Sequence, residues 1–381
     1  MIIAIAGATG NLGQFITAAC LNTPFRGSFR EVRILTRDPS SNKAKELEKA
    51  GAVLKKTDFN QTLKEDLKDV SLFIDVLGSN GDSHKNKDLL LDAVLASDSV
   101  NYYIPSEFGV DTRLVGDYLH PEWGLKLQRE KKARELGKFK VISIFTGLFM
   151  ESSFGPWLGF DVQNQVFTAI GKADIPFSVT SQVDIGLAVA SICSLIAKGV
   201  GNEIPDHVNI SGSSQTINQA AEIFNKYSTS SEKNKEANNE NPNIVKKIVN
   251  EILPHHHHQA IKVEIIPIES FKKDTLAKPF DQNFLDFLRI SISEGKLDYG
   301  KDNSNKLVNP NSMWKFTSLE EYAKSVNGRP WCSDTPQDSR NPIERVNAKI
   351  GLPELIPSHF TADIGQKDGK PKIGMDQTSL P

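Results

Sequence analysis

The sequence predicts an α/β protein with a doubly wound, Rossmann-type parallel sheet and a smaller C-terminal substrate lobe. An apolar run at residues 2–6 leads directly into glycines spaced three apart. Strand-like apolar runs then alternate with helical patterns, which indicates a parallel sheet with helices on both faces. With 381 residues, the chain is long enough for two domains, or for one large domain with a lobe.

The first element is a buried strand that turns at once into a helix. Gly7 permits a tight turn, Gly10 lets the backbone approach a pyrophosphate, and Gly13 lets the helix pack close to the strand. Such a loop places phosphate at a helix N-terminus. A tight turn that binds nothing is the alternative. The candidate cofactor-binding residues of this loop are Gly7, Thr9, Gly10, Asn11, Leu12 and Gly13.

The following elements continue the alternation. We expect strands at 31–35, 52–54, 71–77, 101–104 and 141–145, and helices at 43–50, 88–96 and 121–136. Right-handed crossovers place all the strand carboxyl ends at one edge of the sheet, where ligands bind.

Beyond residue 145 the pattern becomes less regular. A helix opens at 184, a strand follows at 208–210, and helices are expected at 244–253, 282–292 and 318–326. We interpret residues 1–150 as a dinucleotide-binding domain and 151–330 as a substrate-binding lobe. Within the lobe, the polar stretch 228–243 is expected to be a flexible insertion, and residues 331–381 an extended or disordered tail.

The choice of cofactor is expected to depend on the end of the second strand. NAD enzymes usually place a carboxylate there for the ribose 2′-hydroxyl. This strand instead ends in Thr36 and Arg37, and a guanidinium can clamp a 2′-phosphate. Lys43 adds positive charge from the next helix, whereas Asp38 could still serve a ribose. We therefore predict NADP(H) over NAD, with Arg37 alternatively a plain surface residue.

Two further strand ends face the same edge. Residues 58–60 lie where an adenine ring would rest, and Gly78 would allow close approach on the ribose and nicotinamide side. Ordinary strand-end turns explain both segments equally well.

Composition excludes several classes of function. The 45 basic and 47 acidic residues give a net charge of −2, so nucleic acid and membrane surfaces are not expected as partners. The three dispersed cysteines suit a reduced compartment, and without a leader-like segment we expect a cytoplasmic protein. We interpret His255–His258 as an exposed linker rather than a metal site.

Several motifs resemble one family. The glycine loop, Arg37 and above all Pro105–Gly109 (Pro-Ser-Glu-Phe-Gly) resemble the NmrA-like and isoflavone-reductase-like atypical short-chain dehydrogenases. Asp184–Gly186 also fits that pattern, and the resemblance covers about residues 1–225. It implies a Rossmann domain, a smaller C-terminal lobe and NADPH.

The resemblance also implies a catalytic lysine. Enzymes of the family use a lysine on the helix after Pro-Ser-Glu-Phe-Gly, which corresponds to Lys126 here. An ammonium beside a nicotinamide can polarise a carbonyl or protonate an oxyanion. The alternative is a solvated basic helix face. None of the six tyrosines is followed by a lysine four residues later, so the tyrosine acid of ordinary short-chain dehydrogenases is absent.

Two functions remain open at this point. The first is an NADPH-dependent reductase of a small carbonyl or enone-like substrate, with Phe149, Met150, Phe154 and Trp157 as an apolar pocket wall or as core. The second is a non-catalytic NADP(H)-binding redox sensor that regulates a partner protein. The expected partners are a small-molecule substrate and either a second copy of the chain or such a regulated protein.

Overall fold

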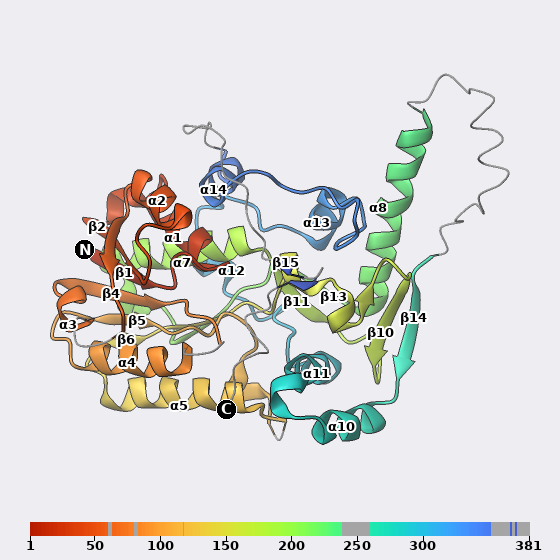
Figure 1. Cartoon of the computed structure of the whole chain (residues 1–381), viewed down its shortest axis with the longest axis horizontal. Helices are drawn as coiled ribbons and strands as arrows, with labels where there is room; N and C mark the ends of the chain where they lie inside the picture. The colour runs from red at the N-terminus through yellow and green to blue at the C-terminus, as the bar shows by residue number, and fades with distance from the viewer. Residues whose placement is uncertain are drawn as a thin grey trace.

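The computed structural model describes residues 1–59, 63–79, 83–116, 118–237, 260–351, 366–367 and 370–371. Figure 1 shows two halves side by side: one contains the N-terminal strands, and the other contains smaller sheets with later helices.

The first half is organised around a six-stranded parallel sheet with the order β3-β2-β1-β4-β5-β6. This is the order of dinucleotide-binding doubly wound sheets, so the predicted Rossmann-type fold is confirmed. The strands are β1 (Ile2–Ala6), β2 (Glu31–Thr36), β3 (Val53–Lys56), β4 (Val70–Asp75), β5 (Tyr102–Ile104) and β6 (Lys140–Val141).

The strand predicted at 141–145 is divided in two. Its first part is β6, which pairs with β5, whereas β7 (Ser143–Phe145) pairs in parallel with β12 (His207–Asn209). A strand from beyond residue 200 therefore pairs with a strand that lies before residue 150.

Helices cover both faces of the sheet. Figure 1 shows α1 and α7 on one side and α4 and α5 on the other. The bounds in this half are α1 (Gly13–Leu21), α2 (Asn42–Lys49), α3 (Leu63–Asp66), α4 (Ser83–Leu95), α5 (Pro121–Leu136) and α7 (Gln182–Ala197). A Cβ at Gly186 would lie 2.6 Å from the Phe15 carbonyl oxygen, so this glycine lets α7 cross α1 closely.

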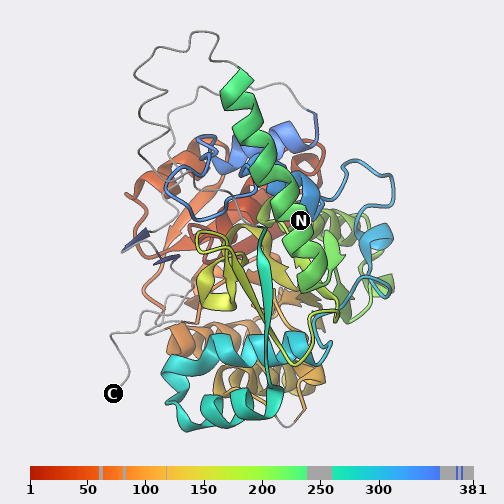
Figure 2. The same cartoon turned by 90° about the vertical axis from the view of Figure 1, so that its right-hand side faces the viewer.

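The second half contains two three-stranded sheets. One has the order β13-β11-β8 and the other β14-β10-β9. The strands are β8 (Leu148–Phe149), β9 (Phe160–Asp161), β10 (Val166–Ile170), β11 (Phe177–Thr180), β13 (Ser213–Gln215) and β14 (Lys262–Ile266). Figure 2 shows β14 running beside β10 although it follows much later in the chain.

The remaining helices surround these sheets. They are α6 (Met150–Ser153), α8 (Ile217–Ala237), α10 (Ile268–Ala277), α11 (Phe280–Ser293), α12 (Asn305–Val308), α13 (Leu319–Ser325) and α14 (Pro342–Lys349). Short 3-10 turns lie at Arg26–Ser28, Thr112–Leu114, Pro156–Leu158 and Gly201–Glu203, and a two-stranded ladder joins β15 (Gln366–Lys367) to β16 (Lys370–Pro371).

Two expectations for the C-terminal part differ from the structure. Helix α8 continues through Ala237, into the predicted flexible insertion, because polar residues can propagate a helix that a packed apolar face has started. The rest of the insertion, the expected helix at 244–253 and His255–His258 lie outside the described residues.

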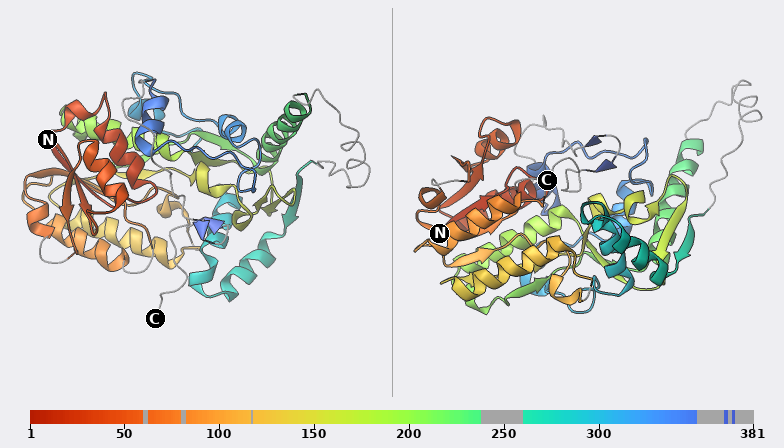
Figure 3. Two further views of the ribbon diagram at one scale, coloured as in Figure 1. Left: turned by 45° about the horizontal axis from the view of Figure 1, so that its top comes forward. Right: turned by 60° about the horizontal axis from the view of Figure 1, so that its bottom comes forward.

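The predicted tail is also ordered as far as residue 351. Helix α14 begins with a capping box between Asn341 and Glu344, and it buries Val346 against the first half. Figure 3 shows α14 beside α1, and the two helices are in contact. The helix has only eight residues, so its amphipathic periodicity was too weak to predict a helix among the surrounding Pro, Asp and Lys residues.

Candidate active site

The glycine loop forms the predicted tight connection between β1 and α1. Gly7 has a φ of 81°, a conformation that favours glycine. A Cβ at Gly13 would lie 2.0 Å from the Gly7 carbonyl oxygen, so the helix start packs directly on the turn. The two glycines make a compact loop at the helix N-terminus, as a phosphate site requires.

The residues between these glycines differ in accessibility. Gly10 and Asn11 are exposed, Thr9 is half-buried, and the Leu12 side chain is buried in the core of the first half. Only the backbone of Leu12 could therefore contact a cofactor, whereas Gly10 and Asn11 are open to one.

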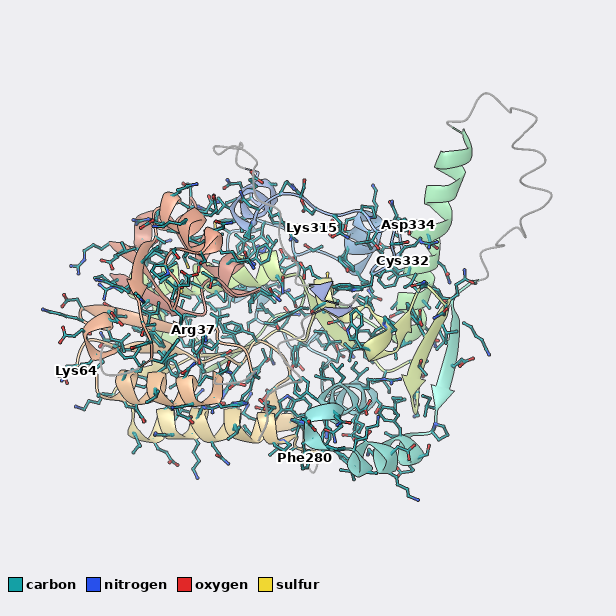
Figure 4. All side chains as sticks on the ribbon, viewed as in Figure 1. Arg37, Lys64, Phe280, Lys315, Cys332 and Asp334 are labelled. Carbon is teal, nitrogen blue, oxygen red and sulfur yellow. The ribbon has the colours of Figure 1, made fainter. Side chains whose placement is uncertain are left out.

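The end of β2 presents the predicted cation. Arg37 is exposed directly after the buried Thr36, and no described residue forms a hydrogen bond or ion pair with its guanidinium. Figure 4 places Arg37 in the half that holds the parallel sheet. Lys43 is half-buried near the start of α2.

One oxygen of the competing carboxylate, Oδ1 of Asp38, is engaged by its own turn. Asp38 accepts hydrogen bonds from both the backbone N–H and the hydroxyl of Ser40, and these bonds lower the pKa of Asp38. The free guanidinium fits a cofactor with a 2′-phosphate better than one with a ribose hydroxyl.

The loops after β4 and β5 are joined at the same edge. Ser106 donates a hydrogen bond of 2.8 Å from its hydroxyl to the Leu77 carbonyl oxygen, next to the exposed Gly78. Of the segment 58–60, Phe59 is a buried core residue, and Asn60 lies outside the described residues.

Lys126 lies against the Pro-Ser-Glu-Phe-Gly motif. It is half-buried on α5, and its Nζ donates a hydrogen bond of 2.7 Å to the backbone carbonyl oxygen of Glu107. The lysine named by the motif resemblance thus contacts that motif at the carboxyl end of β5.

Lys126 belongs to a buried group of charges that the sequence analysis missed. Asp75, Lys87 and Glu107 are 2 %, 3 % and 3 % exposed. Burial raises the pKa of Asp75 and of Glu107, and nearby Lys87 and Lys126 oppose both shifts. Burial also lowers the pKa of Lys87 to about 8.

A signal for Lys87 was present in the sequence. It lies three and four residues before Leu90 and Leu91, both buried on α4, so it continues their apolar stripe. A lysine on a buried stripe beside acids is a candidate functional residue.

The predicted aromatic wall has another role. Met150 and Phe154 are fully buried in the core of the second half, and Phe149 packs against the core of the first. Trp157 makes an edge contact with Trp331 at a centroid distance of 5.1 Å. These side chains are therefore mainly core, the alternative that the sequence left open.

The described part of the chain holds no cluster of histidine, cysteine or acidic residues that could bind a metal ion. Among its helices, none is long and apolar enough to cross a membrane.

The sheet order and the glycine loop define a Rossmann-type fold. The chain belongs to the NmrA-like family, which it matches over residues 1–323.

Similar folds occur among solved reductases. The complex of leucoanthocyanidin reductase with NADPH from Vitis vinifera superposes with a TM-score of 0.60 at 18% identity, covering 85% of this chain and 99% of that one. Isoflavone reductase superposes with a TM-score of 0.61 at 17% identity, covering 84% of this chain and 98% of that one. The NADPH-dependent quinone oxidoreductase QOR2 from Escherichia coli, in complex with NADPH, gives 0.55 at 17% identity, covering 84% and 98%.

One curated relative also shares sequence. The oxidoreductase aprR of Aspergillus flavus is 29% identical over 193 residues, which cover 49% of this chain and 62% of that protein.

Proposed function

We propose that this protein is an NADPH-dependent reductase of a small carbonyl or enone-like molecule. The observation that carries the proposal is the position of Lys126, which contacts the Glu107 carbonyl at the edge where the strands of the parallel sheet end. The similarly folded leucoanthocyanidin reductase and QOR2 were solved with NADPH, and the relative from A. flavus is an oxidoreductase.

The residues at this edge fit NADPH. The loop from Gly7 to Gly13 would hold the pyrophosphate through its backbone N–H groups, and Arg37 the 2′-phosphate. When bound, the nicotinamide supplies a hydride. Lys126 can then donate a proton, or its positive charge, to the oxygen on which negative charge develops. The backbone carbonyl oxygen of Glu107 orients the ammonium by accepting a hydrogen bond from one of its three N–H groups.

The catalytic role is tested by Lys126→Met, which keeps an unbranched side chain without the ammonium. We expect NADPH oxidation with the best substrate of a carbonyl, enone and quinone library to fall about 100- to 10,000-fold. NADPH affinity, measured by fluorescence titration, should change little. The control is Lys131→Met, which removes an exposed ammonium from the same helix. A Lys126→Met enzyme that turns over at the wild-type rate excludes the proposed acid.

Cofactor choice is tested by Arg37→Met. We expect the wild type to bind NADPH more tightly than NADH. In the variant this preference should fall about 10- to 150-fold, because a charged hydrogen bond to phosphate contributes about 1.5–3 kcal/mol. Arg30→Met is the control, since Arg30 is exposed at the other end of β2. Equal affinities for the two cofactors in the wild type would contradict the proposal.

A redox sensor is the second candidate. The contact between α14 and α1 favours it, because a segment beyond the family match touches the helix that would bind the cofactor. Tight NADPH binding without turnover on any library member would support the sensor over the reductase.

A further inference from the structure

A cavity of about 550 Å³ lies between the N-terminus of α7, helix α13, helix α14 and the chain that connects these two. Its volume is within the range of pockets that hold small organic molecules. Glu151, Ser181 and Val183 form one wall, and residues 317–349 supply the others.

Much of this cavity is built from chain beyond the family match. The match ends at residue 323, whereas lining residues continue from Ser325 to Lys349. None of the predicted cofactor residues, nor Lys126, lines the cavity. Figure 4 shows Cys332, a lining residue, beside α13 in the second half and away from Arg37. The cavity is thus separate from the candidate active site.

The acidic groups of the wall already have close partners. Both carboxylate oxygens of Glu151 accept from the Gln182 backbone N–H, at 3.0 and 3.1 Å. Asp338 accepts two hydrogen bonds from Arg340, at 2.9 and 2.8 Å. These carboxylates have little need of a cationic ligand.

Two hydrogen-bond donors in the wall have no close acceptor among the described residues. The Arg345 guanidinium lies 3.4 Å from Asp338 and 3.7 Å from Glu151, and it makes no hydrogen bond to a described residue. Charge-assisted hydrogen bonds are normally about 2.7–2.9 Å long. The Trp331 indole nitrogen is buried and has no hydrogen-bond partner among the described residues. Both groups need an acceptor.

Aromatic and proline side chains form the apolar part of the wall. Tyr322, Trp331, Pro330 and Pro336 line the cavity. Trp331 has a φ of 63°, an unusual conformation for a bulky residue. Such strain is commonly found at ligand-binding positions, and flat apolar walls suit an aromatic ring.

We propose that this cavity binds a small aromatic carboxylate, with its carboxylate on the Arg345 guanidinium and its ring against Trp331. Arg345 also lies 4.8 Å above the ring of Phe15 in α1. The ligand would therefore sit next to the helix that follows the glycine loop while leaving that loop free. The proposal concerns a second site and does not depend on the reductase activity.

The test is isothermal titration of the full chain with 2-naphthoate, with and without saturating NADPH. Its matched neutral probe is 2-naphthylmethanol, which keeps the ring and lacks the charge. We expect one naphthoate per chain under both conditions, at least tenfold tighter than the alcohol. Arg345→Met should weaken naphthoate binding at least tenfold, and Arg30→Met should not.

Trp331→Phe provides a second variant if Arg345→Met does not fold by circular dichroism. It keeps a ring and removes the indole N–H, so binding should weaken several-fold. The proposal is overturned if naphthoate does not bind at millimolar concentration, if the alcohol binds equally well, or if NADPH displaces naphthoate. It is also overturned if every folded cavity variant binds like the wild type.

Discussion

The candidate active-site edge and the cavity at α13 and α14 treat charge in opposite ways. At the edge, Asp75, Lys87 and Glu107 are almost completely buried, and one carboxylate oxygen of Glu107 has no hydrogen-bond partner among the described residues. Around the cavity, charged side chains such as Asp338 and Arg340 remain partly exposed to solvent and pair with each other. Buried charged groups are typical of reactive sites, whereas solvated ion pairs contribute little to stability.

The two regions should therefore differ in how well they tolerate substitutions. The edge depends on a tight glycine loop and on buried charges, so small alterations should be costly. The cavity walls belong to short capped helices and a connecting loop, so single alterations should be tolerated. Three measurements test this contrast.

The largest effect is expected for Gly13→Ala. The added Cβ would lie 2.0 Å from the backbone oxygen of Gly7, which no rotamer change can relieve. We expect about 3 kcal/mol less unfolding free energy in urea, together with weaker NADPH binding. Gly27→Ala is the control, because a Cβ there meets nothing within 4 Å. If the two variants are equally stable, the loop is less tightly packed than described.

A pH-dependent effect is expected for Lys87→Met. The pKa of Lys87 is about 8 in the fold against its usual 10.5. Between these pH values the unfolded chain binds more protons than the folded one. The stability of the wild type relative to the variant should therefore rise from pH 8 to 10.5, and this gain should be lost as the pH falls back to 8. The change is on the order of 2–3 kcal/mol.

This difference is measured by urea unfolding of both proteins at several pH values. Lys85→Met, an exposed position on the same helix, should show no such change. A Lys87→Met difference that is constant across this range would show that Lys87 is not held in a desolvated environment.

The smallest effect is expected beside the cavity, for Glu321→Ala. The backbone N–H of Ser318 and the Lys315 ammonium hold the pKa of Glu321 at about 2, against 4.5 normally. Loss of the capping box of α13 should cost about 0.5–1 kcal/mol at pH 7. This difference should be present above pH 4.5 and disappear as the pH falls to 2. Thermal melts of this variant and of Glu320→Ala would detect the difference. Equal losses of stability in the two variants would exclude a specific contribution of the capping box.

The parts of the fold that could be predicted are those with strong local signals. The strands of the parallel sheet are continuous apolar runs, and their order follows from the crossover rules, so the α/β class was reached from residues 1–145. Lys126 was located only through a motif resemblance, since its helix face is otherwise charged and ordinary.

What could not be predicted depends on contacts between distant segments. β14 pairs with β10, although α7 and α8 separate the two strands in the sequence. Glu151 and Arg345 likewise line one cavity although they are far apart in the sequence. No local pattern carries such pairings. Trp157 meets Trp331 for the same reason: two isolated tryptophans in the sequence become neighbours only through the fold.

The close contact between α1 and α7 affects how the chain can fold while it is being synthesised. One side of α1, including the carbonyl of Phe15, is covered by residues that emerge from the ribosome about 170 positions later. β7 likewise can pair with β12 only after residues 207–209 have been made. A nascent chain that stops near residue 150 would hold the cofactor loop while leaving a helix uncovered. The parallel-sheet half therefore completes its packing only when the chain that follows it has been made.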